Sequence, residues 1–475
     1  MLIQKLSDSA SIQHRYLYDY FVNTLGWFSH NTPGKGQFKL TFSESEKKGI
    51  QRSSENLSTI FINEQTAQVM ENRLSCRDAP SPDHEPLPLK VAELDLILKD
   101  FQQEMVTFCQ QHKIPFLSKM PWPLGNPFAL VISHDIDLIR KYGPRILAKD
   151  LFTVNFKKFR QHFAQSVYRE NLYWNFDDIL DFYDDQDIIS TFFFIARGWE
   201  NLNYRYNINT AKFHQLFEKI MQKNHEIGLH SSRYAFDYPK RILREKKKLE
   251  KTIGEEIKGV RQHYLRLQFP EAWRNFQNAG LQYDSSCGYN RAMGFRAGTS
   301  FPYKTFDVEK AEILKFYEIP FLVMDYPWLE GQSNHPGRQF EFQEIVDQIE
   351  KCQGLLHILW HPHNLVEHEF KPLWESIFSW LEHKKYYNNS LKRILMWWEN
   401  RAGIALKQLK TDEGFFDFVL ESGHQVNNLC LQLISPAPLV LNPQLARVNP
   451  DNQFLYRVTI KHLKIGTEQF RFFFA

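Results

Sequence analysis

Three short clusters of acidic residues and histidines in this 475-residue sequence have the types and spacing of a hydrolytic site. They contain Asp135 and Asp137, then His230, and finally His361. Two carboxylates at positions i and i+2 can divide the work, because one can hold a metal ion while the other accepts a proton from water. Histidine can serve either as a metal ligand or as an acid near neutral pH. Each cluster directly follows or ends an apolar run, which indicates a position at the end of a strand.

Each cluster also has an ordinary structural explanation. The Asp-x-Asp pair could supply a helix N-cap and a solvated acid. His230, which follows a glycine that permits close backbone approach, is a weak metal signal when taken alone. His361 could belong to a plain strand-to-loop turn in which the backbone satisfies the imidazole. The three clusters carry more weight together than separately.

The elements that would position these residues are predicted strands alternating with predicted helices. Apolar runs at 128–132, 188–195 and 355–360 predict buried strands, and the stretches 212–223 and 241–253 predict helices. This alternation is typical of a parallel α/β architecture. In such folds, the polar residues just past the carboxyl ends of the strands form the site.

The two flanking segments have a different character. Residues 1–124 mix a helical pattern with strand patterns and predict an α+β accessory domain. Residues 409–475 consist of short alternating stretches and predict a small all-β, sandwich-like domain. The α/β pattern between them, at 125–408, predicts the domain that carries the site.

Composition limits the classes of partner. The 58 basic and 55 acidic residues leave a net charge of +3, which gives no general field for nucleic acid or anionic membrane. The most apolar stretch, 188–196, is too short to span a bilayer, so we expect no transmembrane segment. The start lacks the pattern of a secretory signal, and the five scattered cysteines suit free thiols, so we expect a cytoplasmic protein.

Four motifs in a fixed order resemble the NodB homology domain of the polysaccharide deacetylases, carbohydrate esterase family 4. They are Ser-His-Asp-Ile-Asp at 133–137, His-Glu-Ile-Gly-Leu-His at 225–230, Arg-Gln-His-Tyr at 261–264 and Leu-Trp-His at 359–361. The string Gly-Val-Arg-Gln-His-Tyr-Leu-Arg from 259 is similar to a bacterial branch that carries an uncharacterised N-terminal domain. The resemblance covers roughly residues 125–400.

The resemblance implies an irregular NodB-type (β/α) barrel and a set of roles for the matching positions. These roles agree with the chemistry of the side chains. The resemblance implies a general base at Asp135, metal ligands at Asp137 and His230, an arginine that orients the base at Arg261, a backbone N–H for the oxyanion at Tyr264, and a general acid at His361.

One position departs from the family pattern. The family usually supplies a second histidine four residues after the first, and here that position is Tyr234. Two protein ligands hold a divalent ion poorly. We therefore hypothesise that His263 supplies the missing ligand to a divalent metal, with zinc as the expected ion. The alternative is that His263 forms a hydrogen bond with the base or the substrate.

Four further residues are candidates for substrate binding, each with a structural alternative. Arg296, in the segment 294–299 that we expect to cover the pocket, could bind a carboxylate or phosphate or could form a structural ion pair. Trp360 could stack on a sugar or pack in the core. Asp284 could be a turn carboxylate, and His363 follows the predicted acid by two positions.

The sequence therefore predicts a metal-dependent hydrolase that removes an acyl group, most naturally acetyl, from an amino sugar or an acetylated glycan precursor. With a cytoplasmic location, a nucleotide- or lipid-linked sugar is the natural substrate. One alternative is a non-catalytic carbohydrate-binding or glycan-assembly protein that kept the barrel. Another is hydrolysis of a non-sugar C–N bond on the same fold.

Overall fold

The structure is a computed structural model that describes most of the chain. No helix within the described ranges is long and apolar enough to cross a membrane. Apart from a few isolated residues between 149 and 163, the described ranges are 3–4, 10–30, 37–43, 49–54, 57–76, 87–140, 173–196, 206–329, 338–367, 371–448 and 454–474.

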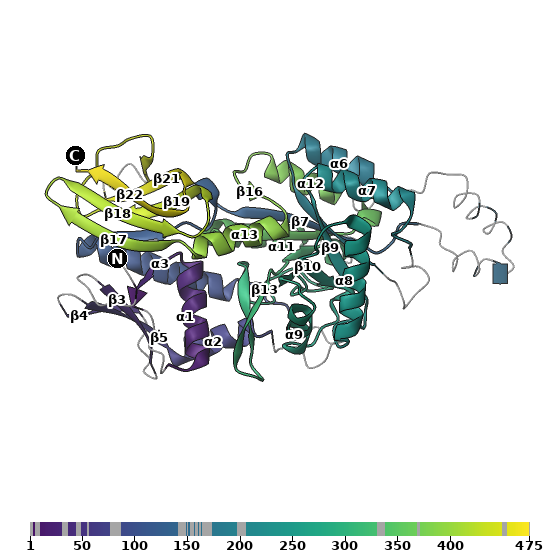
Figure 1. The fold of residues 1–475 in the computed structure, drawn as a ribbon, viewed down its shortest axis with the longest axis horizontal. Coiled ribbons are helices and arrows are strands. Elements are labelled where there is room, and N and C mark those ends of the chain that lie inside the picture. The colour runs from purple at the N-terminus through teal and green to yellow at the C-terminus, as the bar shows by residue number, and fades with distance from the viewer. Residues whose placement is uncertain are drawn as a thin grey trace.

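A ten-stranded, largely parallel sheet forms the centre of the molecule (Figure 1). Its strands follow the order β12-β13-β11-β10-β9-β8-β7-β15-β14, and β16 pairs with β7. All pairs are parallel except β12 with β13. This architecture confirms the predicted irregular α/β barrel. The strands are β7 (Ala129–Ile136), β8 (Ser190–Phe194), β9 (Glu226–Ser231), β10 (Gly259–Gln262), β11 (Tyr283–Asp284), β12 (Tyr303–Asp307), β13 (Glu312–Glu318), β14 (Val323–Met324), β15 (Leu355–Trp360) and β16 (Tyr387–Asn388).

Helices cover the outside of this sheet, as Figure 1 shows for α6, α7 and α8. In α7, Phe213, Leu216, Phe217 and Ile220 are buried, which is the spacing of one apolar helix face. Strand β7 is buried at every residue, because both of its faces are covered. The helices are α6 (Phe176–Asp185), α7 (Ala211–Gln222), α8 (Pro239–Ile253), α9 (Glu271–Asn278), α10 (Asp325–Leu329), α11 (Arg338–Cys352), α12 (Lys371–Leu381) and α13 (Leu391–Ala402), with short 3₁₀ turns η3 (His263–Leu265) and η4 (Pro362–Val366).

The N-terminal part is a five-stranded sheet with three helices. The strand order is β2-β1-β3-β5-β4. The hydroxyl of Tyr16 in α1 donates to the Lys304 carbonyl at 2.8 Å, which attaches this part to the barrel. Its elements are β1 (Ile3–Gln4), α1 (Ile12–Thr24), β2 (Ser29–His30), β3 (Gln37–Ser43), β4 (Gly49–Ser54), β5 (Leu57–Asn63), α2 (Glu64–Leu74) and α3 (Glu93–Gln111).

Helix α3 attaches to the barrel through a buried carboxylate. Asp95 accepts hydrogen bonds from the Thr299 hydroxyl at 2.5 Å and from the Ser300 amide at 2.9 Å and hydroxyl at 2.6 Å. The Leu94 amide donates to the Gly298 carbonyl at 2.9 Å. Residues 294–299 are all buried by these contacts. The prediction that this segment forms a loop over the pocket is therefore wrong, since it is the surface on which α3 packs.

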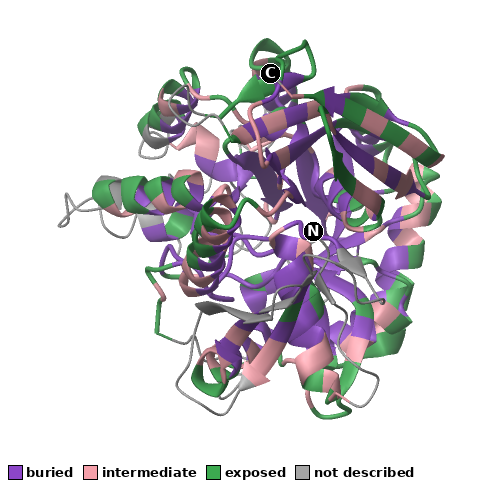
Figure 2. Cartoon of the chain, turned by 90° about the vertical axis from the view of Figure 1, so that its left-hand side faces the viewer, coloured by how far each residue is buried: buried purple, intermediate pink, exposed green. Residues whose placement is uncertain are grey.

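The C-terminal part consists of two antiparallel sheets whose inner faces share one apolar cluster, as the sequence predicted. Partly buried and exposed residues alternate along most of β22, and Figure 2 shows such bands on these strands. Strand β6 (Phe116–Lys119) pairs with β19, so a segment from the N-terminal side of the barrel completes a C-terminal sheet. The other strands are β17 (Ala405–Asp412), β18 (Phe415–Ser422), β19 (Val426–Ile434), β20 (Leu445–Arg447), β21 (Leu455–Leu463) and β22 (Gly466–Phe473), and the turn η1 (Pro123–Gly125) follows β6.

A buried arginine joins all three parts. The guanidinium of Arg401, in the last turn of α13, donates to the carbonyls of Asn23, Thr24, Lys119 and Met120 at 2.7–3.1 Å. Two of these carbonyls belong to the C-terminal end of α1, where the helix dipole favours a cation. Burial lowers the pKa of Arg401 to about 9.

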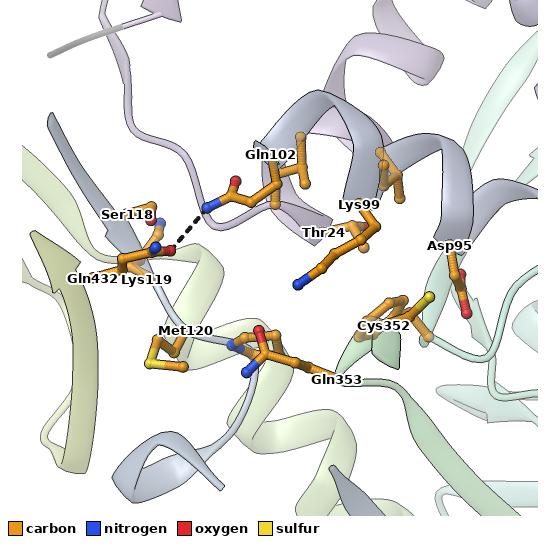
Figure 3. Close-up of a pocket in the computed structure, with 14 residues that line it drawn as sticks. Thr24, Asp95, Lys99, Gln102, Ser118, Lys119, Met120, Cys352, Gln353 and Gln432 are labelled. Atoms are coloured by element: carbon orange, nitrogen blue, oxygen red, sulfur yellow. Dashed lines mark hydrogen bonds between the residues drawn. The ribbon is translucent and has the colours of Figure 1, made fainter. Parts of the chain in front are cut away.

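A small cavity of about 50 Å³ lies beside this junction (Figure 3). Lys99 and Gln102 of α3 line it, and the Gln102 amide donates to the Gln432 side chain of β19 at 3.0 Å. Ligand pockets are typically several hundred Å³, so this space fits a few water molecules rather than a sugar.

We expect Arg401→Met to lower the free energy of unfolding by about 2–4 kcal/mol, because four buried carbonyls lose a charged donor. Arg393→Met, on the same helix, is the matched control, since Arg393 makes an exposed hydrogen bond to Asn224. Chemical denaturation followed by circular dichroism measures both variants. Equal destabilisation by the two substitutions would show that the junction does not depend on Arg401.

Candidate metal and acid–base site

The carboxyl ends of four parallel strands bring together the residues that the sequence singled out. Asp135 and Asp137 lie at the end of β7, His230 lies in β9, and His361 follows β15. Strand β7 pairs directly with β15, and it reaches β9 through β8. The predicted convergence at one end of the barrel is therefore observed.

Asp137, His230 and His263 form the centre of the site. The Asp137 Oδ1 atom lies 3.1 Å from His230 Nε2 and 3.4 Å from His263 Nε2. One ligand atom from each residue lies within 4.8 Å of the other two. Both imidazoles are buried, and the Asp137 side chain is 13% exposed.

These three residues fit a divalent metal ion. The His230 Nδ1–H donates to the Arg261 carbonyl at 2.9 Å, which leaves the lone pair of Nε2 directed toward Asp137. Burial alone would raise the pKa of Asp137, but the neighbouring His263 and His230 hold it well below its ordinary value. Two neutral imidazoles and one carboxylate are the donor set of catalytic zinc sites that keep a further position open.

Tyr234, at the family's usual second-histidine position, lies outside this cluster. Its ring is 39% exposed and lies against the guanidinium groups of Arg233 and Arg266, at 5.4 and 4.8 Å. His263 lies in the cluster instead, at the position that our hypothesis requires.

The predicted base, Asp135, faces Arg261. Its Oδ1 lies 3.5 Å from Arg261 Nη1, and its Oδ2 lies 3.8 Å from His230 Nε2. Arg261 is fully buried between the rings of Phe193 and Phe321, at 5.0 and 4.9 Å. The guanidinium is therefore fixed by packing as well as by charge.

A chain of hydrogen bonds with a fixed direction supports Arg261. The Pro320 carbonyl can only accept, so His357 Nδ1–H donates to it at 3.1 Å and His357 Nε2 carries a lone pair. The Ser133 hydroxyl then donates to Nε2 at 2.9 Å. The Ser133 oxygen is left to accept from Arg261 Nη2 at 3.2 Å. Burial and the charge of Arg261 hold the pKa of His357 well below its ordinary value, which agrees with a neutral imidazole.

The predicted acid, His361, has a carboxylate partner that the sequence reading missed. Asp325, the first residue of α10, accepts from His361 Nδ1 at 2.9 Å and from the His361 amide at 2.7 Å. Burial alone would lower the pKa of His361, but Asp325 and the carboxylates of Asp137 and Asp135 raise it to about 9. His361 Nε2 lies 3.7 Å from Asp137 Oδ2. Asp325 directly follows the short strand β14, and this strand-end position was the available signal.

Tyr264 lies at the edge of the site in an unusual conformation. Its φ of 63° and that of Leu265, 49°, are both in the left-handed region that non-glycine residues rarely adopt. Its ring is 46% exposed and stacks on His263 at 4.1 Å between centroids. Such local strain next to a ligand cluster is typical of functional loops. The oxyanion role remains a prediction.

All four predicted substrate contacts are buried. Arg296 donates to the Gly288 carbonyl at 3.1 Å, and Trp360 packs edge-on against Trp374 at 5.0 Å. Asp284 is fully buried, and burial together with the charge of Glu318 raises its pKa well above the ordinary value. His363, also buried, contacts the Tyr326 hydroxyl at 3.3 Å through Nε2.

No family model and no curated protein sequence matches the chain. Among solved structures, 38 chains match. They include a probable polysaccharide deacetylase from Pseudomonas aeruginosa, at 15% identity and a TM-score of 0.40, covering 58% of this chain and 93% of that one. PuuE allantoinase matches at 16% identity and a TM-score of 0.38, and the match covers 58% of this chain and 92% of that one. A CE4 family pseudoenzyme from Bacillus anthracis matches at 11% identity and a TM-score of 0.31, and the match covers 56% of this chain and 65% of that one.

At these identities the likeness concerns the fold alone. The sheet order and the convergence of the four motifs at the carboxyl ends of parallel strands define an irregular α/β barrel of the NodB type. The resemblance seen in the sequence is thereby confirmed at the level of the fold.

We expect purified protein to bind about one equivalent of zinc and His263→Ala to lose most of it, because only two ligands remain. Elemental analysis after dialysis measures the metal content. Tyr234→Ala is the matched control and should keep its metal, since its ring lies outside the cluster. An unchanged metal content in His263→Ala would exclude His263 as a ligand.

Proposed function

We propose that this protein is a metal-dependent carbohydrate deacetylase that hydrolyses an N- or O-acyl group, preferably acetyl, on an amino sugar or acetylated glycan precursor. The observation that carries the proposal is the placement of the Asp137 cluster between two acid–base groups. Asp135 lies on one side with Arg261, and His361 lies on the other with Asp325.

The reaction needs one group that accepts a proton and one that donates a proton, and Asp135 and His361 supply them. A divalent ion held by Asp137, His230 and His263 would lower the pKa of a water molecule and polarise the acyl oxygen. Asp135 takes the proton of the attacking water, and Arg261 holds the carboxylate in position. The C–N or C–O bond breaks toward the leaving atom, which takes a proton from His361.

The environment of His361 supports its role as the acid. With a pKa of about 9, the imidazole is protonated at neutral pH and can donate. After donation, Asp325 keeps the neutral ring oriented through Nδ1. We assign the backbone N–H of Tyr264 to the developing oxyanion, and His363 to contact with the substrate.

The segments 1–124 and 409–475 are proposed to be accessory parts that flank the 125–408 barrel, although β6 of the first segment completes a sheet of the second and β17 begins at Ala405. The alternative function is a non-catalytic carbohydrate-binding protein on the same barrel, which the family departure at Tyr234 favours. Hydrolysis of a non-sugar C–N bond would use the same residues.

We expect the zinc-loaded protein to release acetate from N-acetylated amino sugars or their oligomers, and Asp135→Asn to lower kcat at least about 100-fold, because the amide cannot accept the proton. Acetate release is measured alongside metal content, which should not change. If the native protein binds zinc and sugar but releases no acetate, the non-catalytic alternative is favoured.

We expect Ser133→Ala to lower kcat about 10-fold with little change in KM, because Arg261 loses one acceptor that holds it against Asp135. Ser133→Thr, which keeps the hydroxyl, should restore most of the rate. Steady-state kinetics and zinc content separate this effect from damage to the metal cluster. Equal losses in both variants would show that packing at this position, rather than the hydroxyl, is what matters.

A further inference from the structure

Two cysteines from distant parts of the chain meet in the interior, away from the residues proposed for catalysis. The sulfur atoms of Cys76 and Cys287 lie 3.0 Å apart, although the residues are 211 positions apart in sequence. Both side chains are buried, at 3% and 0% exposure. Cys76 follows α2 of the N-terminal part, and Cys287 follows β11 of the barrel.

The backbone at Cys76 is held in an unfavourable conformation that places its side chain at this contact. Its φ of 50° is left-handed, and it is the residue after Ser75, the C-cap of α2. Helices commonly end in glycine at this position, because a side chain there strains the backbone.

The other three cysteines lack a thiol neighbour in the described structure. Cys109 contacts the thioether of Met105 at 3.7 Å, and Cys430 contacts that of Met120 at 3.4 Å. Cys352 lines the small cavity at the junction. All five cysteines are buried, and within the described residues only Cys76 and Cys287 bring their sulfurs close together.

We propose that Cys76 and Cys287 are an oxidisable pair whose disulfide links the N-terminal part to the barrel. A peroxide is the oxidant: the two thiols give up two protons and two electrons, one S–S bond forms, the O–O bond breaks, and hydrogen peroxide is reduced to two waters. A disulfide needs sulfurs about 2.05 Å apart, so the two atoms must approach by only about 1 Å. The hydroxyl of Tyr303, 3.4 Å from the Cys76 sulfur, is the nearest polar group.

The Cys76–Cys287 disulfide would act on the residues that hold Arg261 in position. The two residues before Cys287 hold the end of β10: the Ser285 hydroxyl accepts from Arg261 at 3.0 Å, and the Ser286 hydroxyl accepts from the Gln262 amide at 2.8 Å. The Cys287 amide itself donates to Glu318 at 3.0 Å. Oxidation would therefore tie α2 to the segment that positions the arginine facing the base.

The surroundings also indicate how the pair would react. Burial, together with Cys76, raises the pKa of the Cys287 thiol well above its ordinary value. A protonated thiol is a poor nucleophile, so we expect slow oxidation. Once formed, the bond would be protected from reductants by its burial and would close a loop of about 200 residues.

The experiment uses the full-length protein, treated either with dithiothreitol or with hydrogen peroxide, then denatured and alkylated. The reduced sample should show five alkylated cysteines. The oxidised sample should show three, with a cross-linked peptide containing Cys76 and Cys287. Five alkylated cysteines after oxidation, a cross-link between other cysteines, or sulfinic acid at Cys76 without a cross-link would each overturn the proposal.

Thermal unfolding gives a second measurement. The oxidised protein should melt about 5 °C or more above the reduced protein, because the cross-link restricts the unfolded chain. Cys76→Ser should abolish this difference, while Cys430→Ser, the matched control at another buried thiol, should keep it. If Cys76→Ser does not fold, the thiol count on the unaltered protein decides by itself.

Discussion

The site depends on one carboxylate that faces three imidazoles. Asp137 lies 3.1 Å from His230 and 3.4 Å from His263 through one oxygen, and 3.7 Å from His361 through the other. What distinguishes the histidines is the partner of their second nitrogen. His230 donates to a backbone carbonyl through Nδ1, which turns its Nε2 toward the cluster as a possible ligand atom. His361 donates to the carboxylate of Asp325, which favours the charged ring and the role of an acid.

The same reasoning separates the two fully buried arginines. Arg261 faces Asp135, whose carboxylate balances its charge. Two serine hydroxyls hold the guanidinium in place, and the guanidinium in turn positions the proposed base. Arg401 binds only carbonyl oxygens, and burial lowers its pKa. Its bonds connect three parts of the chain without touching the site. One buried cation therefore serves the proposed chemistry, and the other serves the assembly of the fold.

The sequence predicted the features that depend on strand ends and motif order. Asp135, His230 and His361 each follow or end a clearly apolar run, and the structure brings them together. Asp325 was missed because the strand before it, β14, is only two residues long and leaves no pattern. For Trp360 and Arg296 the sequence left substrate binding and structural packing both open, because it shows the type of a residue but not the direction of its side chain. The pairing of β6 with β19 joins segments over 300 positions apart, and no local pattern encodes it.

The proposed replacement of the ligand expected at Tyr234 by His263 agrees with the geometry of a parallel sheet. His230 lies opposite Arg261 in the paired strands β9 and β10. His263 follows Arg261 by only two residues. Adjacent strands lie about 4.8 Å apart, which is within the span of a small metal cluster. A side chain at the end of the next strand can therefore reach the space that the family fills from four residues further along the chain, beyond the end of β9. The donor number can be kept although the motif is broken, because the sheet, rather than the spacing in sequence, fixes which side chains meet.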